Sequence, residues 1–128
     1  MFRYVFRPYD QIYPERFFKE KDRLKKFFGE DILIEHVGST SVPGMGGKGI
    51  IDIAVAAKSK DDLLNISTKL IKAGYYYEEA DGTPDRWFHG RKISDSERYH
   101  LHLTYRGSKD WVEMNAFRDY LKTYPEDF

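Results

Sequence analysis

One stretch of the sequence, Ile50 to Ala57, constrains the fold more than any other. Its residues are apolar at both alternating positions of an extended chain, and Asp52 is the charged exception. Because successive side chains of a strand point to opposite faces, such a strand must be covered on both faces. Burying an unpaired carboxylate is costly, so Asp52 needs a partner: Lys48, an arginine such as Arg86, or a metal ion. As a metal ligand or catalytic base, Asp52 would mark a functional site.

Helical and extended patterns alternate around this strand. Periodicity near 3.6 predicts three helices, at residues 14–28, 59–73 and 108–123. Apolar and alternating runs predict five strands, at residues 32–37, 50–57, 75–78, 86–89 and 98–105. A turn is expected at residues 81–84, and Trp111, Met114, Phe117 and Leu121 are expected to face the core. This order predicts a single α+β domain over residues 1–128, with a small mixed sheet flanked by helices.

Composition excludes several classes of protein. The 21 basic and 21 acidic residues cancel, which argues against a protein that coats nucleic acid or binds a membrane surface. The absence of cysteine excludes a disulfide scaffold, a cysteine-ligated zinc site and a thiol nucleophile. No apolar run approaches a membrane span, and the start lacks the apolar segment of a signal peptide, so we expect a cytoplasmic protein. The 21 aromatic residues fill a core or offer stacking surfaces for rings. Nothing in the composition indicates an oligomeric state.

A glycine-rich segment, residues 38–49, separates the strand at 32–37 from the apolar strand. It contains the pattern G-x-G-x-x-G at Gly44, Gly46 and Gly49. The dinucleotide fingerprint requires that pattern to open a helix, whereas here it runs into a strand. A dinucleotide site is therefore not expected, and the spacing around the lysine also fails the Walker A pattern.

The start of the same segment is suited to a phosphate group. Gly38, Ser39 and Thr40 follow a strand directly, so backbone N–H groups and two hydroxyls could donate to an anion, and Lys48 adds a positive charge. The alternative is a crossover loop whose glycines only permit tight turns.

His100 and His102 lie two residues apart on one predicted strand and therefore point the same way. The spacing suits two metal ligands or two donors to a phosphate, and equally the solvated face of an edge strand. His36, near the phosphate-like turn, could join them.

Several of these residues together resemble the signature of the GrpB-like family, within the nucleotidyltransferase (polymerase-β-like) fold superfamily. The block from Glu35 to Gly44, EHVGSTSVPG, is followed by Lys48 and by IIDI at Ile50–Ile53. Supporting similarities lie at Tyr9–Phe17, His100–Leu103 and Phe117–Leu121. Members of the family are expected to continue past Pro125–Phe128 into a further helix, so this sequence is expected either to be a naturally short member or to represent part of a longer one.

The resemblance implies a nucleotidyltransferase-like fold that acts on a nucleotide or another phosphorylated small molecule. The Gly38-Ser39 turn would hold the triphosphate, and Asp52 would hold Mg²⁺ or Mn²⁺ for transfer of a nucleotidyl group to an acceptor. Such enzymes place an Asp-x-Asp pair on this strand, but here Ala54 stands in the second position. His100 or His102 would lie where a third carboxylate is expected.

Three hypotheses follow. The first is a nucleotidyltransferase that uses Asp52, with His100 and His102 completing a metal site. The second is a nucleotide- or phosphate-binding module that has lost catalysis, which Ala54 favours. The third is a hydrolase in which His36, His100, His102 and Asp52 surround zinc, manganese or iron.

Overall fold

The computed structural model describes residues 6–29 and 31–125. Of the Pro125–Phe128 region only Pro125 is described, and the expected further helix lies outside the described residues. Its elements run in the order α1 (Ile12–Phe28), β1 (Leu33–Val37), β2 (Ile51–Ala57), α2 (Leu63–Lys72), β3 (Tyr76–Thr83), β4 (Arg86–Ser94), β5 (Glu97–Tyr105) and α3 (Lys109–Thr123). Short 3₁₀ turns span Ser39–Ser41 and Lys60–Asp62. The predicted α+β class is confirmed.

The five strands form one mixed sheet in the order β1-β2-β5-β4-β3. β2 pairs antiparallel with β1 and parallel with β5, and the remaining neighbours are antiparallel. Every residue of β2 except Asp52 is buried, which confirms the interior, doubly covered strand that its apolar run predicts.

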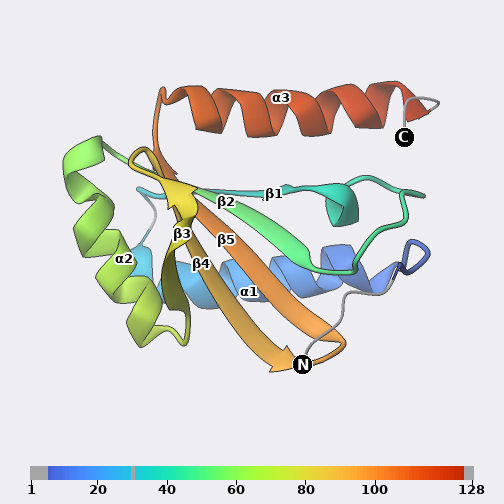
Figure 1. The fold of residues 1–128 in the computed structure, drawn as a ribbon, viewed down its shortest axis with the longest axis horizontal. Helices are drawn as coiled ribbons and strands as arrows, with labels where there is room; N and C mark the ends of the chain where they lie inside the picture. The colour runs from blue at the N-terminus through green and yellow to red at the C-terminus, as the bar shows by residue number, and fades with distance from the viewer. Residues whose placement is uncertain (1–5, 30, 126–128) are drawn as a thin grey trace.

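The two faces of the sheet have different coverings. One face packs on α1 and α2 and carries the main apolar core, to which β2 contributes Ile51, Ile53 and Val55, and β5 contributes Leu101 and Leu103. The other face carries Asp52 and the histidines of β5 and lies under α3. In Figure 1, α3 (red) runs along one side of the sheet while α1 (blue) passes on the other.

A buried carboxylate ties α1 to the sheet. Glu20 is 4% exposed and accepts hydrogen bonds from Arg23, Arg91 and the Tyr75 hydroxyl. Burial by itself would raise the pKa of Glu20, but the hydrogen bonds from Arg23 and Tyr75 hold it below its ordinary value. The carboxylate therefore stays charged in a site that would otherwise favour its neutral form.

The elements differ from expectation in several places, and β4 reaches Ser94 although the predicted strand ends at residue 89. β3 continues through the predicted turn to Thr83, whose partner across the hairpin is Arg86, so the turn lies at Pro84 and Asp85. Ser108 caps α3 as its hydroxyl accepts from the Trp111 amide, but of the four α3 residues expected to face the core only Leu121 is buried. A groove lined by Met114 and Phe117 separates that part of the helix face from the sheet. Across the described residues, we find no helix long and apolar enough to span a membrane.

Candidate functional site

The turn after β1 brings the loop against β2. Gly38 has φ 74° and ψ −174°, a combination that is essentially restricted to glycine. A Cβ at Gly38 would lie 2.5 Å from Oδ2 of Asp52, so the carboxylate packs directly on the turn. Further along the loop, Gly47 pairs with Arg7 in an antiparallel bridge, and a Cβ at Gly47 would lie 2.6 Å from Oγ of Ser39. Gly38 therefore makes room for the carboxylate of Asp52, and Gly47 makes room for the hydroxyl of Ser39.

Asp52 is the second residue of β2 and lies level with His100 on β5. Its side chain is 27% exposed, more than the apolar surroundings predict. Oδ1 lies 3.3 Å from Nε2 of His102 and 4.0 Å from Nδ1 of His100. The predicted arginine, Arg86, reaches this carboxylate only through His102. The expected convergence of Asp52 with the two histidines is thus present in the structure.

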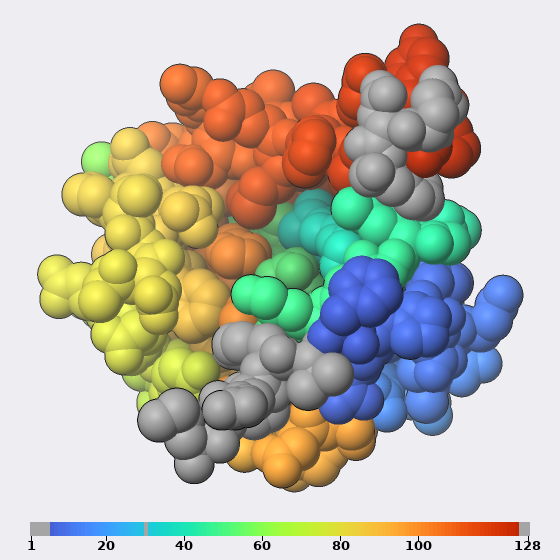
Figure 2. Space-filling view, turned by 45° about the vertical axis from the view of Figure 1, so that its right-hand side comes forward, coloured from blue at the N-terminus to red at the C-terminus, as the bar shows by residue number. Residues whose placement is uncertain are grey.

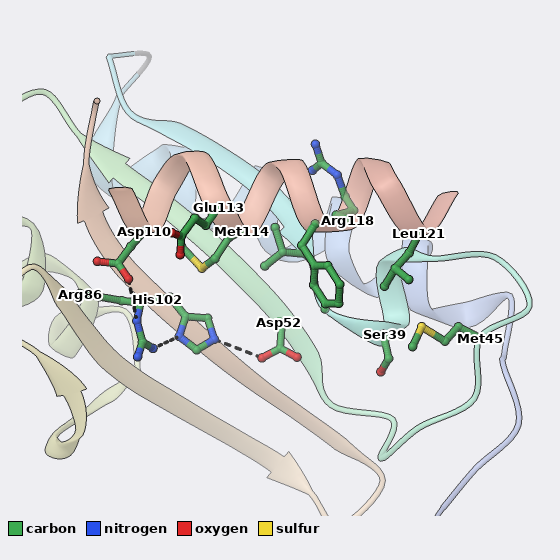
Figure 3. A pocket seen from close by; sticks show the side chains of 13 residues that line it. Ser39, Met45, Asp52, Arg86, His102, Asp110, Glu113, Met114, Arg118 and Leu121 are labelled. Atoms are coloured by element: carbon green, nitrogen blue, oxygen red, sulfur yellow. Dashed lines mark hydrogen bonds and ion pairs between the residues drawn. The ribbon is translucent and has the colours of Figure 1, made fainter. Parts of the chain in front are cut away.

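A polar chain fixes the orientation of His102. The Arg86 guanidinium donates to Nδ1 of His102 at 3.3 Å, and Nε of Arg86 lies 3.4 Å from Oδ1 of Asp110 on α3 (Figure 3). Because a guanidinium can only donate, Nδ1 must accept, and the proton of the neutral ring is on Nε2. His102 therefore donates to Asp52. This arrangement disfavours the predicted role of His102 as a metal ligand, because Nε2 faces the site with its proton attached.

His100 is the second imidazole beside the carboxylate, and at 4.0 Å its Nδ1 lies beyond hydrogen-bond distance of Oδ1. Burial lowers the pKa of His100 below its ordinary value, although the negative charge of Asp52 acts in the opposite direction. The Phe88 ring contacts His100 edge-on at 4.9 Å between centroids and His102 at 5.8 Å. Both imidazoles are thus held between an aromatic ring and a carboxylate.

Two predicted site residues point elsewhere. His36 is level with Ile53, on the face that packs against α1, where its ring stacks on Phe17 at 4.6 Å. Nε2 of His36 bonds to Oγ1 of Thr40 at 2.9 Å, and Thr40 is 2% exposed. The hydrolase constellation that includes His36 is therefore wrong, since the sheet separates His36 from Asp52. The hydroxyl predicted to contact phosphate at Thr40 is instead used inside the fold.

Two cavities meet at the candidate site. One of about 350 Å³, called the polar cavity after Ser39, Lys48, Asp52 and His100, is also lined by Gly47 and Ile50, and apolar atoms make up much of its surface. A second, of about 340 Å³, is a largely apolar groove beneath α3 that Ser39, Asp52 and His102 also line. Figure 2 shows this side of the molecule, with α3 (red) along its upper rim and the loop and β2 (green) beneath. Ser39 and Asp52 belong to both cavities, so one ligand could contact both.

The residues present fit a divalent cation only as a partner of phosphate. Within the described ranges, no group of three or more histidine and acidic side chains could hold a metal by itself. Ala54, at the position of the usual second carboxylate, lies between Glu35 on β1 and His102 on β5. Glu35 does not replace that carboxylate, because it is paired with Arg118 of α3 at 3.0 Å. Mg²⁺ commonly takes one or two carboxylates, with phosphate oxygens and water as its other ligands. Asp52 suffices for that arrangement, whereas a cage built from protein alone is not supported.

Sequence reasoning missed the α3 side of the site. Asp110 ties Arg86 to α3, and Met45 of the loop lines the groove together with Met114 and Phe117. Methionine and phenylalanine at helical spacing have the same pattern as core residues. No sequence signal could distinguish a stripe that faces a groove from one that is packed.

Comparison with known proteins identifies relatives across nearly the whole chain. The family model described as GrpB protein matches residues 4–128. UPF0157 protein YqkA of Bacillus subtilis is 32% identical over 91% of this chain and 34% of its own length. UPF0157 protein BH1888 of Halalkalibacterium halodurans is 35% identical over 93% of this chain and 60% of its own. The chain thus spans between about a third and three fifths of these two relatives.

Comparison with solved structures identifies the fold of the chain. The conserved protein GrpB from Enterococcus faecalis superposes with a TM-score of 0.81 at 28% identity, over 95% of this chain and 74% of that one. The Cid1 poly(U) polymerase in its MgGTP-bound form has a TM-score of 0.61 at 12% identity, over 93% of this chain and 39% of that one. The second likeness shows the nucleotidyltransferase fold alone. The chain belongs to the GrpB family and has the nucleotidyltransferase fold.

Proposed function

We propose that this chain binds a nucleotide, with the phosphates in the polar cavity and one divalent cation between them and Asp52. The observation that carries the proposal is that Ser39 and Asp52 lie together at the junction of the two cavities. The lining of one cavity includes Lys48 and His100, and the other cavity is largely apolar, which suits a ligand with a charged end and an apolar end.

The polar cavity offers donors for phosphate oxygens. Among the described residues no side chain is hydrogen-bonded to the Ser39 hydroxyl, which leaves it available to a ligand. Lys48 lines the same cavity and supplies positive charge, and the ring of His100 supplies a further nitrogen. Gly47 brings backbone close to Ser39 with no side chain in between.

The cation follows from the charge of the ligand. A carboxylate beside a polyphosphate would repel it, and a divalent ion between the two converts that repulsion into attraction. Oδ1 of Asp52 accepts from His102, and Oδ2 lies against Gly38. Mg²⁺ or Mn²⁺ would neutralise phosphate charge there. The MgGTP-bound Cid1 poly(U) polymerase, which has the same fold, supports the choice of a nucleotide with magnesium.

Isothermal titration calorimetry with MgATP and MgGTP tests the proposal. Asp52→Asn should abolish the dependence of affinity on Mg²⁺, and Ser39→Ala should weaken binding about tenfold through loss of a hydrogen bond to a charged group. Asp22→Asn, which removes an exposed carboxylate from α1, is the matched control and should bind like the wild type. Equal affinities for Asp52→Asn and wild type, with and without Mg²⁺, would contradict the proposal.

Nucleotidyl transfer is the second candidate, which the position of Asp52 next to the Gly38-Ser39 turn favours. Transfer would join an acceptor oxygen to the α-phosphorus and release pyrophosphate. Since Ala54 removes one of the usual carboxylates, we expect transfer to be slow and to depend on Asp52. Pyrophosphate release from each NTP, measured with Mn²⁺ and Mg²⁺ and a panel of hydroxyl acceptors, separates the two candidates. Binding without release supports a module that holds nucleotides without transferring them.

A further inference from the structure

The inner face of α3 presents apolar side chains, whereas the sheet on the other side of the groove presents polar ones. Met114, Phe117 and Leu121 follow each other at helical spacing on the side that lines the groove. The sheet beneath presents Asp52 and His102 (Figure 3). An apolar helix face normally packs on an apolar sheet face, but here about 340 Å³ of space separates the two.

The consequence is visible at Phe117. Although it lines the groove, this residue remains 65% exposed, whereas Leu121, one turn further along α3, is 6% exposed. Met45 approaches from the glycine-rich loop and closes the end of the groove beside Ser39. Methionine and phenylalanine side chains adapt to flat rings and make favourable sulfur–aromatic and stacking contacts.

We propose that this groove binds the base of the nucleotide whose phosphates lie at Ser39 and Asp52, with Phe117 and Met114 as its apolar wall. The inference rests on the proposed function, because it needs the phosphates at that junction to place the base. A nucleotide fits the two cavities in one particular direction. Its charged end lies with Lys48 and His100, and its ring lies between the apolar face of α3 and the sheet.

The far end of the groove adds polar groups suited to the edge of a base. The Arg86–Asp110 ion pair lies there, and Glu113 is beside it on α3. A guanidinium offers donors and carboxylates offer acceptors, as a heteroaromatic ring with mixed edge groups requires. A purely aliphatic ligand would make no hydrogen bond to these donors and acceptors.

The test compares MgATP with magnesium tripolyphosphate, which has the phosphates and lacks the base and ribose. We expect wild type to bind MgATP at least about tenfold more tightly than tripolyphosphate, since stacking of one base is worth that much. Phe117→Ala should remove most of that advantage and leave tripolyphosphate affinity unchanged. Phe117 is largely exposed, so the variant should fold, and Met114→Ala provides a second probe of the same wall.

Val112→Ala is the matched control, because Val112 is also on α3, is 57% exposed and does not line the groove. The inference is overturned if MgATP and tripolyphosphate bind equally well to wild type, or if Phe117→Ala has no more effect than Val112→Ala. Failure of the proposed function looks different: neither ligand would bind wild type, and both ideas would fall together. In the supporting case, saturation-transfer NMR should give stronger signals from the base protons of ATP than from its ribose.

Discussion

Replacement of Gly38 by alanine tests the central claim about the site, that the turn and the carboxylate pack directly on each other. At φ 74° and ψ −174°, a side chain costs about 1–3 kcal/mol of backbone strain. The new Cβ would also lie 2.5 Å from Oδ2 and 2.9 Å from Cβ of Asp52. Asp52 would have to retreat until these distances exceed 3.0 Å, below which real Cβ contacts are essentially never seen. Overpacking of this kind adds about 1–3 kcal/mol.

Gly29 provides a control with the same backbone geometry. It has φ 79° and ψ −164° at the end of α1, and no heavy atom of the described residues lies within 4 Å of where its Cβ would be. Gly29→Ala therefore incurs the strain without the contact. Both variants gain about 0.4–1 kcal/mol because alanine restricts the unfolded chain. Their difference isolates the contact with Asp52.

Urea unfolding, followed by circular dichroism with a common m-value, measures both variants. We expect Gly38→Ala to lower the free energy of unfolding by about 1–3 kcal/mol more than Gly29→Ala does. MgATP affinity should fall in Gly38→Ala and stay at the wild-type value in Gly29→Ala. Equal destabilisation within about 0.5 kcal/mol would refute the claim that the turn packs on the carboxylate.

Three further predictions concern titration, burial and tautomers. Burial lowers the pKa of His89 to about 4 from an ordinary 6.5, so the unfolded chain takes up a proton first as the pH falls. As the pH falls from 6.5 to 4, protonation of His89 should therefore lower the free energy of unfolding by about 3 kcal/mol. In urea unfolding of His89→Asn, this contribution to the pH dependence should be absent. Glu20→Gln leaves the partly buried Arg23 and Arg91 without a counter-charge and should cost about 1.5–3 kcal/mol in thermal or urea unfolding, whereas the exposed Glu15→Gln should stay within about 0.5 kcal/mol. Long-range ¹⁵N NMR should find a neutral His102 with its proton on Nε2, and Arg86→Leu should shift the ring toward a mixture of tautomers; a proton on Nδ1 in wild type would disprove the polar chain.

Local patterns were enough to predict most of the fold. The apolar run at Ile50–Ala57 predicted an interior strand, and the alternation at 98–105 placed His100 and His102 on one face, as the structure confirms. Ser108 was recognisable as a helix cap, because a hydroxyl that precedes a helical stretch satisfies its first free amides. These features depend on neighbours in the chain, so they can be read without knowledge of the tertiary structure.

Long-range geometry decided what those residues can do. His36 seemed equivalent to the other histidines, but the register of β1 places it on the opposite face from Asp52, because adjacent strands align side chains pair by pair. The role of His102 depends on Arg86, sixteen residues away in sequence, whose guanidinium fixes the proton on the nitrogen that faces Asp52. A sequence pattern contains neither the register nor the tautomer.

The sequence by itself determined the family, the layered α+β architecture and the pairing of a Gly38-Ser39 turn with Asp52. Only the tertiary structure decided that α3 stands away from the sheet and leaves an apolar groove above a polar floor. The physical reason is that periodicity reports which face of a helix is apolar, whereas the distance to the opposing layer decides whether that face is packed or open.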